Sequence, residues 1–166
     1  MHIRNKTHFS RRAFIAAGAG LAVTTALPSG GARAAGIRDY RLSAGSGNTR
    51  LAGAKYPETA VWAYNGQVPG TEIRVRQGDR VRIVVDNRLD EETTVHWHGL
   101  RVPNAMDGVP HLTQKPIAPG KSFTYEFDVP DAGTYWYHPH QRGFEQVARG
   151  LYGPLIVEEK EPVRVD

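Results

Sequence analysis

The sequence predicts an all-β protein whose short strands form an antiparallel sandwich or barrel. The chain has about eight short segments rich in apolar, β-branched and aromatic residues, and several of them alternate polar and apolar residues, which is the period of a strand with two different faces. The 166 residues include 18 Gly and 11 Pro, a proportion that favours frequent turns over a helix bundle. The predicted strands cover residues 40–43, 61–64, 73–76, 81–85, 93–98, 122–129, 133–140 and 155–157.

Turn residues delimit the first four of these strands. The first is a short alternating segment, and the second, at 61–64, combines aromatic and β-branched side chains before Asn65 and a glycine. The third, at 73–76, alternates apolar and basic residues up to a turn around Gly78. The fourth is rich in Val and Ile and ends at Asn87, a residue typical of turns.

The later strands are rich in aromatic residues and enclose a long loop. Phe123, Tyr125 and Phe127 occupy alternate positions in the strand at 122–129, so they share one face. The strands on either side of it both contain Thr and Trp, the strand at 133–140 also contains Tyr, and the last strand contains Leu, Ile and Val. Residues 99–120 form the longest irregular stretch, and such a loop in a small domain indicates a functional segment.

Residues 1–34 are predicted to be a cleaved export signal. A basic start precedes a run of small and apolar residues at 14–27 and the small-residue site at 32–34. Arg11 and Arg12 follow a serine, as in bacterial twin-arginine signals, so we expect the Tat export machinery as a partner and the periplasm or another exported location. The apolar run is shorter than the ~20 residues of a stable membrane span.

The excess of positive charge also belongs to this segment. The chain has 21 Lys+Arg and 17 Asp+Glu, but residues 1–34 hold five of the basic residues and no acidic one. The remainder gives no reason to expect nucleic acid or an anionic membrane as a partner. The chain contains no cysteine, which excludes disulfides, Cys-ligated zinc or iron–sulfur sites and a thiolate-ligated blue-copper site within it.

Two His-x-His pairs stand out among the remaining residues. His96 and His98 form one pair and His138 and His140 the other, whereas His111 stands alone. Residues i and i+2 of a strand point to the same face, so each pair presents its imidazoles together. If the two strands pair, the four rings share one surface that suits Zn, Cu, Fe or Ni ions. Metal binding should then weaken as the pH falls through about 6.5, where imidazoles protonate.

The residues around these pairs closely resemble the paired motifs of the multicopper oxidases, the laccase and ascorbate oxidase family. His-Trp-His-Gly at 96–99 and Tyr-Trp-Tyr-His-Pro-His at 135–140 carry the resemblance. Further segments that look like the family are 65–70, 77–79, 106–114 and 150–158. The resemblance extends over roughly residues 60–160 and implies a Greek-key cupredoxin (plastocyanin-like) β-sandwich at 35–160.

The resemblance also implies a copper centre. Multicopper oxidases bind one type 2 and two type 3 copper ions with eight histidines between their first and last domains, and they reduce O2 to water there. By position, His96 would bind the type 2 copper, His98 and His138 one type 3 copper, and His140 the other.

Three further residues receive roles by their position in these motifs. Asp107 aligns with a family carboxylate that helps to deliver protons to bound oxygen, a catalytic role. Trp97 lies on the strand face opposite to the ligands, so we expect it to pack in the core. His111 is expected to be an exposed loop residue.

The chain alone supplies only half of such a centre. It lacks the other four histidines and the His-Cys-His segment of a type 1 copper, and residues 161–166 look like the start of a linker to a second domain. We therefore expect the N-terminal domain of an oxidoreductase whose C-terminal cupredoxin domains, in the same or another chain, complete the site.

Two alternatives stay open at this point. One is a stand-alone exported copper-binding or tolerance module without oxidase activity. The other is a zinc hydrolase that uses a His-x-His pair, one more histidine and Asp107.

Overall fold

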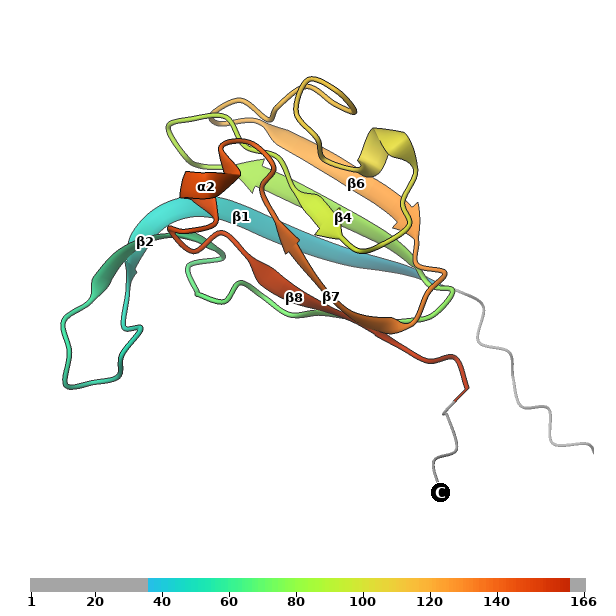
Figure 1. Cartoon of the computed structure of the whole chain (residues 1–166), viewed down its shortest axis with the longest axis horizontal. Coiled ribbons are helices and arrows are strands. Elements are labelled where there is room, and N and C mark those ends of the chain that lie inside the picture. The colour runs from blue at the N-terminus through green and yellow to red at the C-terminus, as the bar shows by residue number, and fades with distance from the viewer. Residues whose placement is uncertain (1–35, 162–166) are drawn as a thin grey trace, which may run out of the picture. The chain divides into compact units, whose positions relative to one another are not determined.

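The computed structural model describes residues 36–161, which form two four-stranded sheets packed against each other (Figure 1). The strands are β1 (Ile37–Thr49), β2 (Thr59–Tyr64), β3 (Ile73–Arg76), β4 (Arg80–Asn87), β5 (His96–His98), β6 (Ser122–Asp128), β7 (Gly133–His138) and β8 (Gly153–Glu158). One sheet has the order β2-β1-β4-β6 and the other β3-β8-β7-β5. The predicted all-β sandwich is confirmed, whereas the predicted export signal and nearly all of the predicted linker lie outside the described residues.

Each sheet contains one parallel pair, so the expectation of purely antiparallel sheets is wrong. β1 pairs with β2 in antiparallel orientation through residues 44–49 and with β4 in parallel through residues 37–44. β3 pairs with β8 in parallel. Alternation along a strand is the same in both orientations, so the sequence pattern does not reveal strand direction. β1 is also longer than predicted, because its second half is small, polar and largely exposed and does not alternate.

Aromatic side chains from both sheets form the centre of the core. The ring of Trp97 on β5 lies 5.2 Å from the rings of Tyr125 and Phe127 on β6, measured between centroids. These three side chains are at most 1% exposed. Burial of an aromatic side chain of this size stabilises a fold by about 2–3 kcal/mol. The predicted packing role of Trp97 is confirmed, and this contact holds β5 against the opposite sheet.

The segments near the histidines differ from their predicted limits. β5 begins at His96 rather than at residue 93, and β7 ends at His138 because Pro139 has no N–H to donate to a strand ladder. A short helix, α2 (Gly143–Gln146), follows, and its four residues are too few to show a helical period. The loop at 99–120 contains the 3-10 helix η1 (Asn104–Met106). No helix within residues 36–161 combines the length and the apolar character needed to cross a bilayer.

A charged cluster joins β1, β4 and β6. Arg41 donates to the carboxylate of Asp86 through Nε at 2.6 Å and Nη2 at 2.9 Å. The hydroxyl of Ser122 donates to the same carboxylate at 2.6 Å. The bond from Ser122, followed by the bonds from Arg41, lowers the pKa of Asp86 below its usual value.

We predict that Asp86→Asn lowers stability at neutral pH and reduces its dependence on pH in acid. A carboxylate with a lowered pKa in the folded state stabilises the fold above its unfolded pKa of about 3.9 and loses this contribution as the pH falls through its folded pKa. The substitution should cost about 1–2 kcal/mol at neutral pH, and the difference from the wild type should shrink in acid. Urea unfolding at neutral and at acidic pH, followed by circular dichroism, measures the free energy of unfolding of both proteins.

Asp39→Asn is the matched control for this prediction. The carboxylate of Asp39 lies on the same sheet, is 67% exposed and is 3.5 Å from Arg82. Such an exposed pair contributes little, so this variant should unfold like the wild type. A constant difference between Asp86→Asn and the wild type across the pH range would contradict the prediction.

Candidate metal centre

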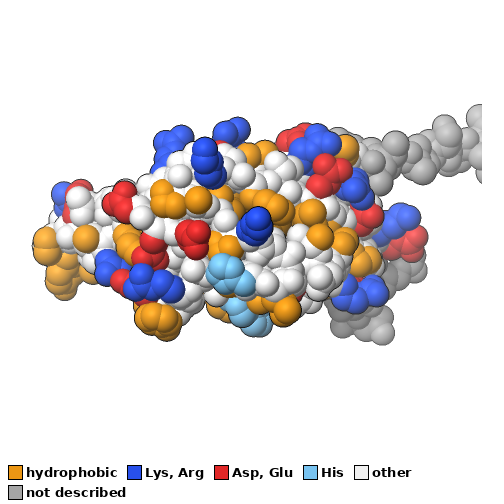
Figure 2. Space-filling view, turned by 90° about the horizontal axis from the view of Figure 1, so that it is seen from above, with side chains coloured by type: hydrophobic (Ala, Val, Ile, Leu, Met, Phe, Trp, Pro, Cys, Tyr) orange, Lys and Arg blue, Asp and Glu red, His pale blue; other side chains and the backbone are white. Residues whose placement is uncertain are grey.

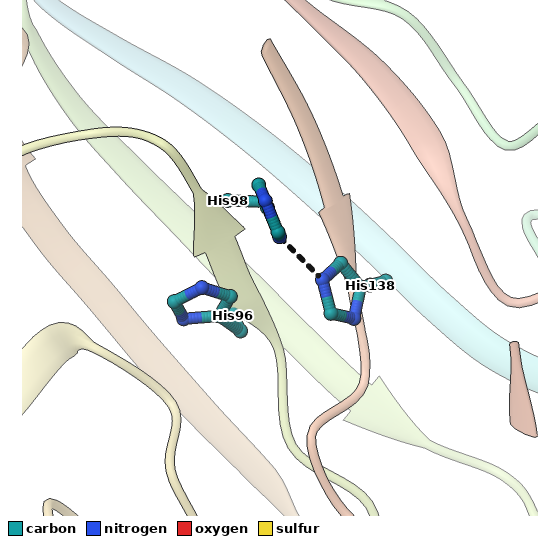
Figure 3. Close-up of side chains that lie close together, drawn as sticks. All are labelled: His96, His98 and His138. Atoms are coloured by element: carbon teal, nitrogen blue, oxygen red, sulfur yellow. Dashed lines mark hydrogen bonds between the residues drawn. The ribbon is translucent and has the colours of Figure 1, made fainter. Parts of the chain in front are cut away.

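The antiparallel pairing of β5 with β7 brings both His-x-His segments together. His96 lies opposite His138, and His98 lies opposite Trp136. Figure 3 shows His96 and His98 on one strand and His138 on its neighbour, with their rings close together. One ring nitrogen from each of the three histidines lies within 4.8 Å of the others. His98 and His140 are exposed, and Figure 2 shows histidine side chains at the molecular surface beside apolar ones, so an ion could reach the cluster from solvent.

His98 and His138 have the spacing of two ligands on one ion. Nδ1 of His98 is 3.2 Å from Nε2 of His138 (Figure 3). Two nitrogens bound to one ion at about 2.0 Å lie about 3.3 Å apart when the angle between them is tetrahedral. The indole of Trp136 stacks on the ring of His138 with centroids 4.0 Å apart, and it lies tilted beside the ring of His98 with centroids 5.0 Å apart. This stacking restricts rotation of the two imidazoles.

Backbone carbonyl groups select the tautomer of two histidines. Nδ1 of His96 donates to the carbonyl of Asp107 at 2.7 Å, and Nδ1 of His138 donates to the carbonyl of Pro139 at 2.9 Å. A carbonyl only accepts, so the proton of each neutral ring lies on Nδ1 and the lone pair on Nε2. Metal-ligating histidines typically donate their other ring nitrogen in this way. His96 and His138 therefore each carry a lone pair on Nε2 that can bind a metal, and in the metal-free chain that of His138 accepts the hydrogen bond from Nδ1 of His98.

The environment also keeps His138 in the form that binds metals. Burial lowers the pKa of its imidazole, and the neighbouring rings of His96, His98 and His140 lower the pKa further. The bond to the carbonyl of Pro139 raises the pKa, by less than burial lowers it but by more than any one of the neighbouring rings does. A metal competes with a proton for the imidazole lone pair, so a lowered pKa favours metal binding at neutral pH.

His140 belongs to the same cluster but is positioned differently. It lies two residues beyond the end of β7, so strand alternation does not orient it. Its ring centroid is 5.2 Å from that of His96 and 6.2 Å from that of His138. Its backbone N–H donates to the hydroxyl of Thr94 at 3.1 Å. The structure thus brings the four predicted rings together, with three of them converging more closely than the fourth.

The loop after η1 presses directly against β5. Oδ1 of Asp107 lies 3.3 Å from Nδ1 of His96, and this carboxylate is 33% exposed. The next residue, Gly108, has φ of 77°, and a Cβ at this position would overlap the backbone carbonyl of Val95. Only glycine combines this backbone conformation with such a close approach. Gly108 therefore allows the carbonyl of Asp107 to reach His96.

The prediction for His111 is confirmed, but several partners of the histidines were not predicted from the sequence. His111 is an exposed loop residue, as expected, and is not one of the three converging histidines. No sequence pattern indicated that the carbonyl groups of Asp107 and Pro139 are partners of the rings. Nor did any pattern indicate Thr94 and Gln146, which are fully buried. A polar residue in a short segment gives no sequence signal for such a role.

Comparison with known proteins identifies the family. The sequence profile of multicopper oxidases matches residues 46–162. The chain belongs to the multicopper oxidase family.

Relatives within this family are much longer than the chain. Copper resistance protein A of Pseudomonas syringae pv. tomato is 44% identical over 124 residues, which are 75% of this chain and 20% of that protein. Multicopper oxidase MmcO of Mycobacterium tuberculosis is 38% identical over 180 aligned positions, covering 98% of this chain and 35% of that protein. The crystal structure of a multicopper oxidase from Pseudomonas thermotolerans superposes with a TM-score of 0.72 and 50% identity, over 76% of this chain and 30% of that chain.

Membership of the multicopper oxidases confirms two expectations from the sequence. The fold is the cupredoxin-like β-sandwich of the family, and copper is the metal that the family membership implies. The donor set fits copper because imidazole nitrogen is a good ligand for this ion. The match also disfavours a zinc hydrolase.

We predict that Gly108→Ala lowers the stability of this domain more than Gly120→Ala does. Gly120 has a similar φ of 71°, and an added Cβ there meets no atom within 4 Å. Gly120→Ala should cost about 1–2 kcal/mol from backbone strain alone. Gly108→Ala should cost a further 1–3 kcal/mol, on the order of an overpacked core site, because the added carbon overlaps Val95. Chemical unfolding of both variants measures the difference, and equal costs would contradict the close approach.

We predict that His96 and His138 are Nδ1–H tautomers in the metal-free chain at neutral pH. Each donates from Nδ1 to a backbone carbonyl, which fixes the position of the proton. Long-range 1H–15N correlation spectra distinguish the two tautomers of each ring directly. An Nε2–H tautomer at either residue would show that its carbonyl bond does not persist in solution.

Proposed function

We propose that this chain is the N-terminal cupredoxin domain of a multicopper oxidase. Its domain at residues 35–160 contributes His96, His98, His138 and His140 to a type 2/type 3 trinuclear copper centre shared with a C-terminal cupredoxin domain. The activity of the whole protein is the reduction of O2 to water coupled to oxidation of an organic compound or a metal ion. Copper, when bound, supplies the one-electron redox chemistry for this reaction.

The convergence of three histidine nitrogens within 4.8 Å is the observation that carries the proposal. No cysteine is present in the chain, so the electron-accepting type 1 copper of an oxidase must be held elsewhere. The chain also spans only 20% and 35% of two curated relatives, which leaves room in such proteins for further domains. Both facts favour a shared centre over a complete site in this chain.

The spacing of the histidine nitrogens supports the assignment of each histidine to a particular copper ion. His98 and His138, whose nitrogens are 3.2 Å apart, would hold one type 3 copper together. His96 would hold the type 2 copper through the Nε2 that its bond to Asp107 leaves free. His140, which stands apart from the three converging nitrogens, would hold the second type 3 copper.

Asp107 is proposed to be the catalytic carboxylate that passes protons toward the centre. Its side chain is 33% exposed and lies 3.3 Å from the imidazole of His96, so it contacts both solvent and the cluster. Reduction of O2 to water consumes four protons, which must reach a site that is enclosed between domains. A partly exposed carboxylate at the edge of the cluster can accept protons from water and transfer them inward.

Export is part of the same proposal. Arg11 and Arg12 and the apolar run after them support transport by the Tat machinery to the periplasm or beyond. Tat substrates cross the membrane in the folded state, so the histidine cluster would be formed before the protein leaves the cytoplasm.

We predict that the full 166-residue chain binds Cu(II) through this cluster. His96→Ala and His138→Ala should each weaken Cu(II) binding by more than about 100-fold. Loss of a residue that only hydrogen-bonds to a ligand already lowers metal affinity by about 10–100-fold. Competition titration against a chelator measures the affinity. Fluorescence of Trp136, whose ring stacks on His138 and lies beside His98, provides a local signal because bound Cu(II) should quench it.

His111→Ala is the control for removal of a histidine outside the cluster. His111 is exposed and lies in the loop between η1 and β6, so this variant should bind Cu(II) as the wild type does. Wild-type affinity in His96→Ala would refute the ligand assignment. The oxygen consumption of the native exported protein tests the reaction itself, and it should disappear with His96→Ala while the rest of the protein stays folded.

A further inference from the structure

A buried glutamine connects the two segments that carry the histidine pairs. The side chain of Gln146 on α2 is fully buried. Its Nε2 donates to Oε1 of Glu91 at 2.7 Å and to the carbonyl of Glu92 at 2.9 Å, and its Oε1 accepts from the hydroxyl of Thr93 at 2.8 Å. Every hydrogen-bonding group of this amide is therefore occupied at least once. Buried amides with complete bonding fix the segments that they join.

A second contact continues this network to the outlying histidine. Thr94 is fully buried, and its hydroxyl accepts from the backbone N–H of His140 at 3.1 Å. Thr94 lies two residues before the start of β5. His140 lies three residues before the start of α2. Arg142 closes the turn between His140 and α2, because its Nη1 donates to Oε2 of Glu91 at 2.6 Å.

These contacts compensate for the lack of a strand at His140. His96, His98 and His138 are oriented by the paired backbones of β5 and β7, but His140 lies beyond the last ladder pair. No hydrogen bond to the ring of His140 is found among residues 36–161, and the residue is exposed. Its backbone contact with Thr94 is thus what relates its position to β5.

We propose that Thr94 is a positioning residue for His140, supported from behind by Gln146 and Thr93. In this arrangement the Thr94 hydroxyl sets the distance between His140 and the three histidines on β5 and β7. The proposal rests on the proposed function only in that His140 is taken to be a copper ligand. A ligand held at a fixed distance binds more tightly than one on a free loop, because less conformational freedom is lost on binding.

A double-mutant cycle on the full chain tests this role, with Cu(II) alone as the probe. Thr94→Val removes the hydroxyl at nearly constant volume and should weaken Cu(II) binding by about 10-fold, as expected for loss of a supporting contact. His140→Ala removes the ligand. Because Thr94 acts through His140, the effect of Thr94→Val should vanish in the His140→Ala background. A purely structural role would weaken binding equally in both backgrounds and would overturn the proposal.

Thr94→Ser is the matched control, since it keeps a hydroxyl at the same position. It should retain most of the wild-type affinity, and a loss equal to that of Thr94→Val would contradict the role of the hydroxyl. The cycle also separates this inference from the proposed function. If His140→Ala leaves Cu(II) binding unchanged, the ligand role of His140 fails; if only Thr94→Val has no effect, the positioning role fails alone.

Hydrogen exchange of the wild-type chain provides a test that does not depend on the folding of any variant. The amide of His140 belongs to an exposed residue, yet its N–H is bonded to the buried Thr94 hydroxyl. We expect this amide to exchange much more slowly than an unbonded amide in a surface loop. Exchange at the unprotected rate would show that the contact does not hold His140 and would overturn the proposal.

Discussion

The position of the histidine cluster depends on the pairing of β5 with β7, in which His96 faces His138 and His98 faces Trp136. A shift of this register by one residue would turn the side chains of β5 to the opposite faces of the sheet. The histidines would then enter the core and Trp97 would face solvent. The large energy of burying Trp97 therefore also fixes the direction in which the two histidines beside it point.

β5 is too short to define this register by itself, so its surroundings must do so. It has three residues and lies at the edge of its sheet, bonded to β7 on one side. The segment before it is held by Asn87, whose Nδ2 donates to the carbonyls of Glu91 and Ile117 at 2.8 and 2.7 Å. Behind it Gly108 permits the neighbouring loop to touch the backbone of Val95. The rigid arrangement of the histidines thus comes from polar contacts of the loops as much as from the sheet.

The fold class and the identity of the candidate ligands could be predicted from the sequence, because both depend on local patterns. Alternation, together with runs of β-branched and aromatic residues, indicated all eight strands, and the spacing within each His-x-His pair implied that its rings share a face. The pairing partners of β1 and β3 could not be predicted, because parallel partners lie far apart in the chain and leave no local turn. The role of Thr94 was hidden for a similar reason, since its partner is the backbone of His140 rather than a recognisable side chain.

The parallel pairs have a consequence for the order in which the protein acquires its structure. Strand β3 pairs with β8, which in turn pairs with β7, and β7 is the partner of β5. β8, the last strand among residues 36–161, is therefore needed to complete the sheet that carries the histidines. Contacts between distant segments form slowly because a long loop must close first. On a ribosome, the polypeptide up to His98 would emerge with its first histidines unassembled, and the histidine cluster would form only after β8 has been synthesised and docked.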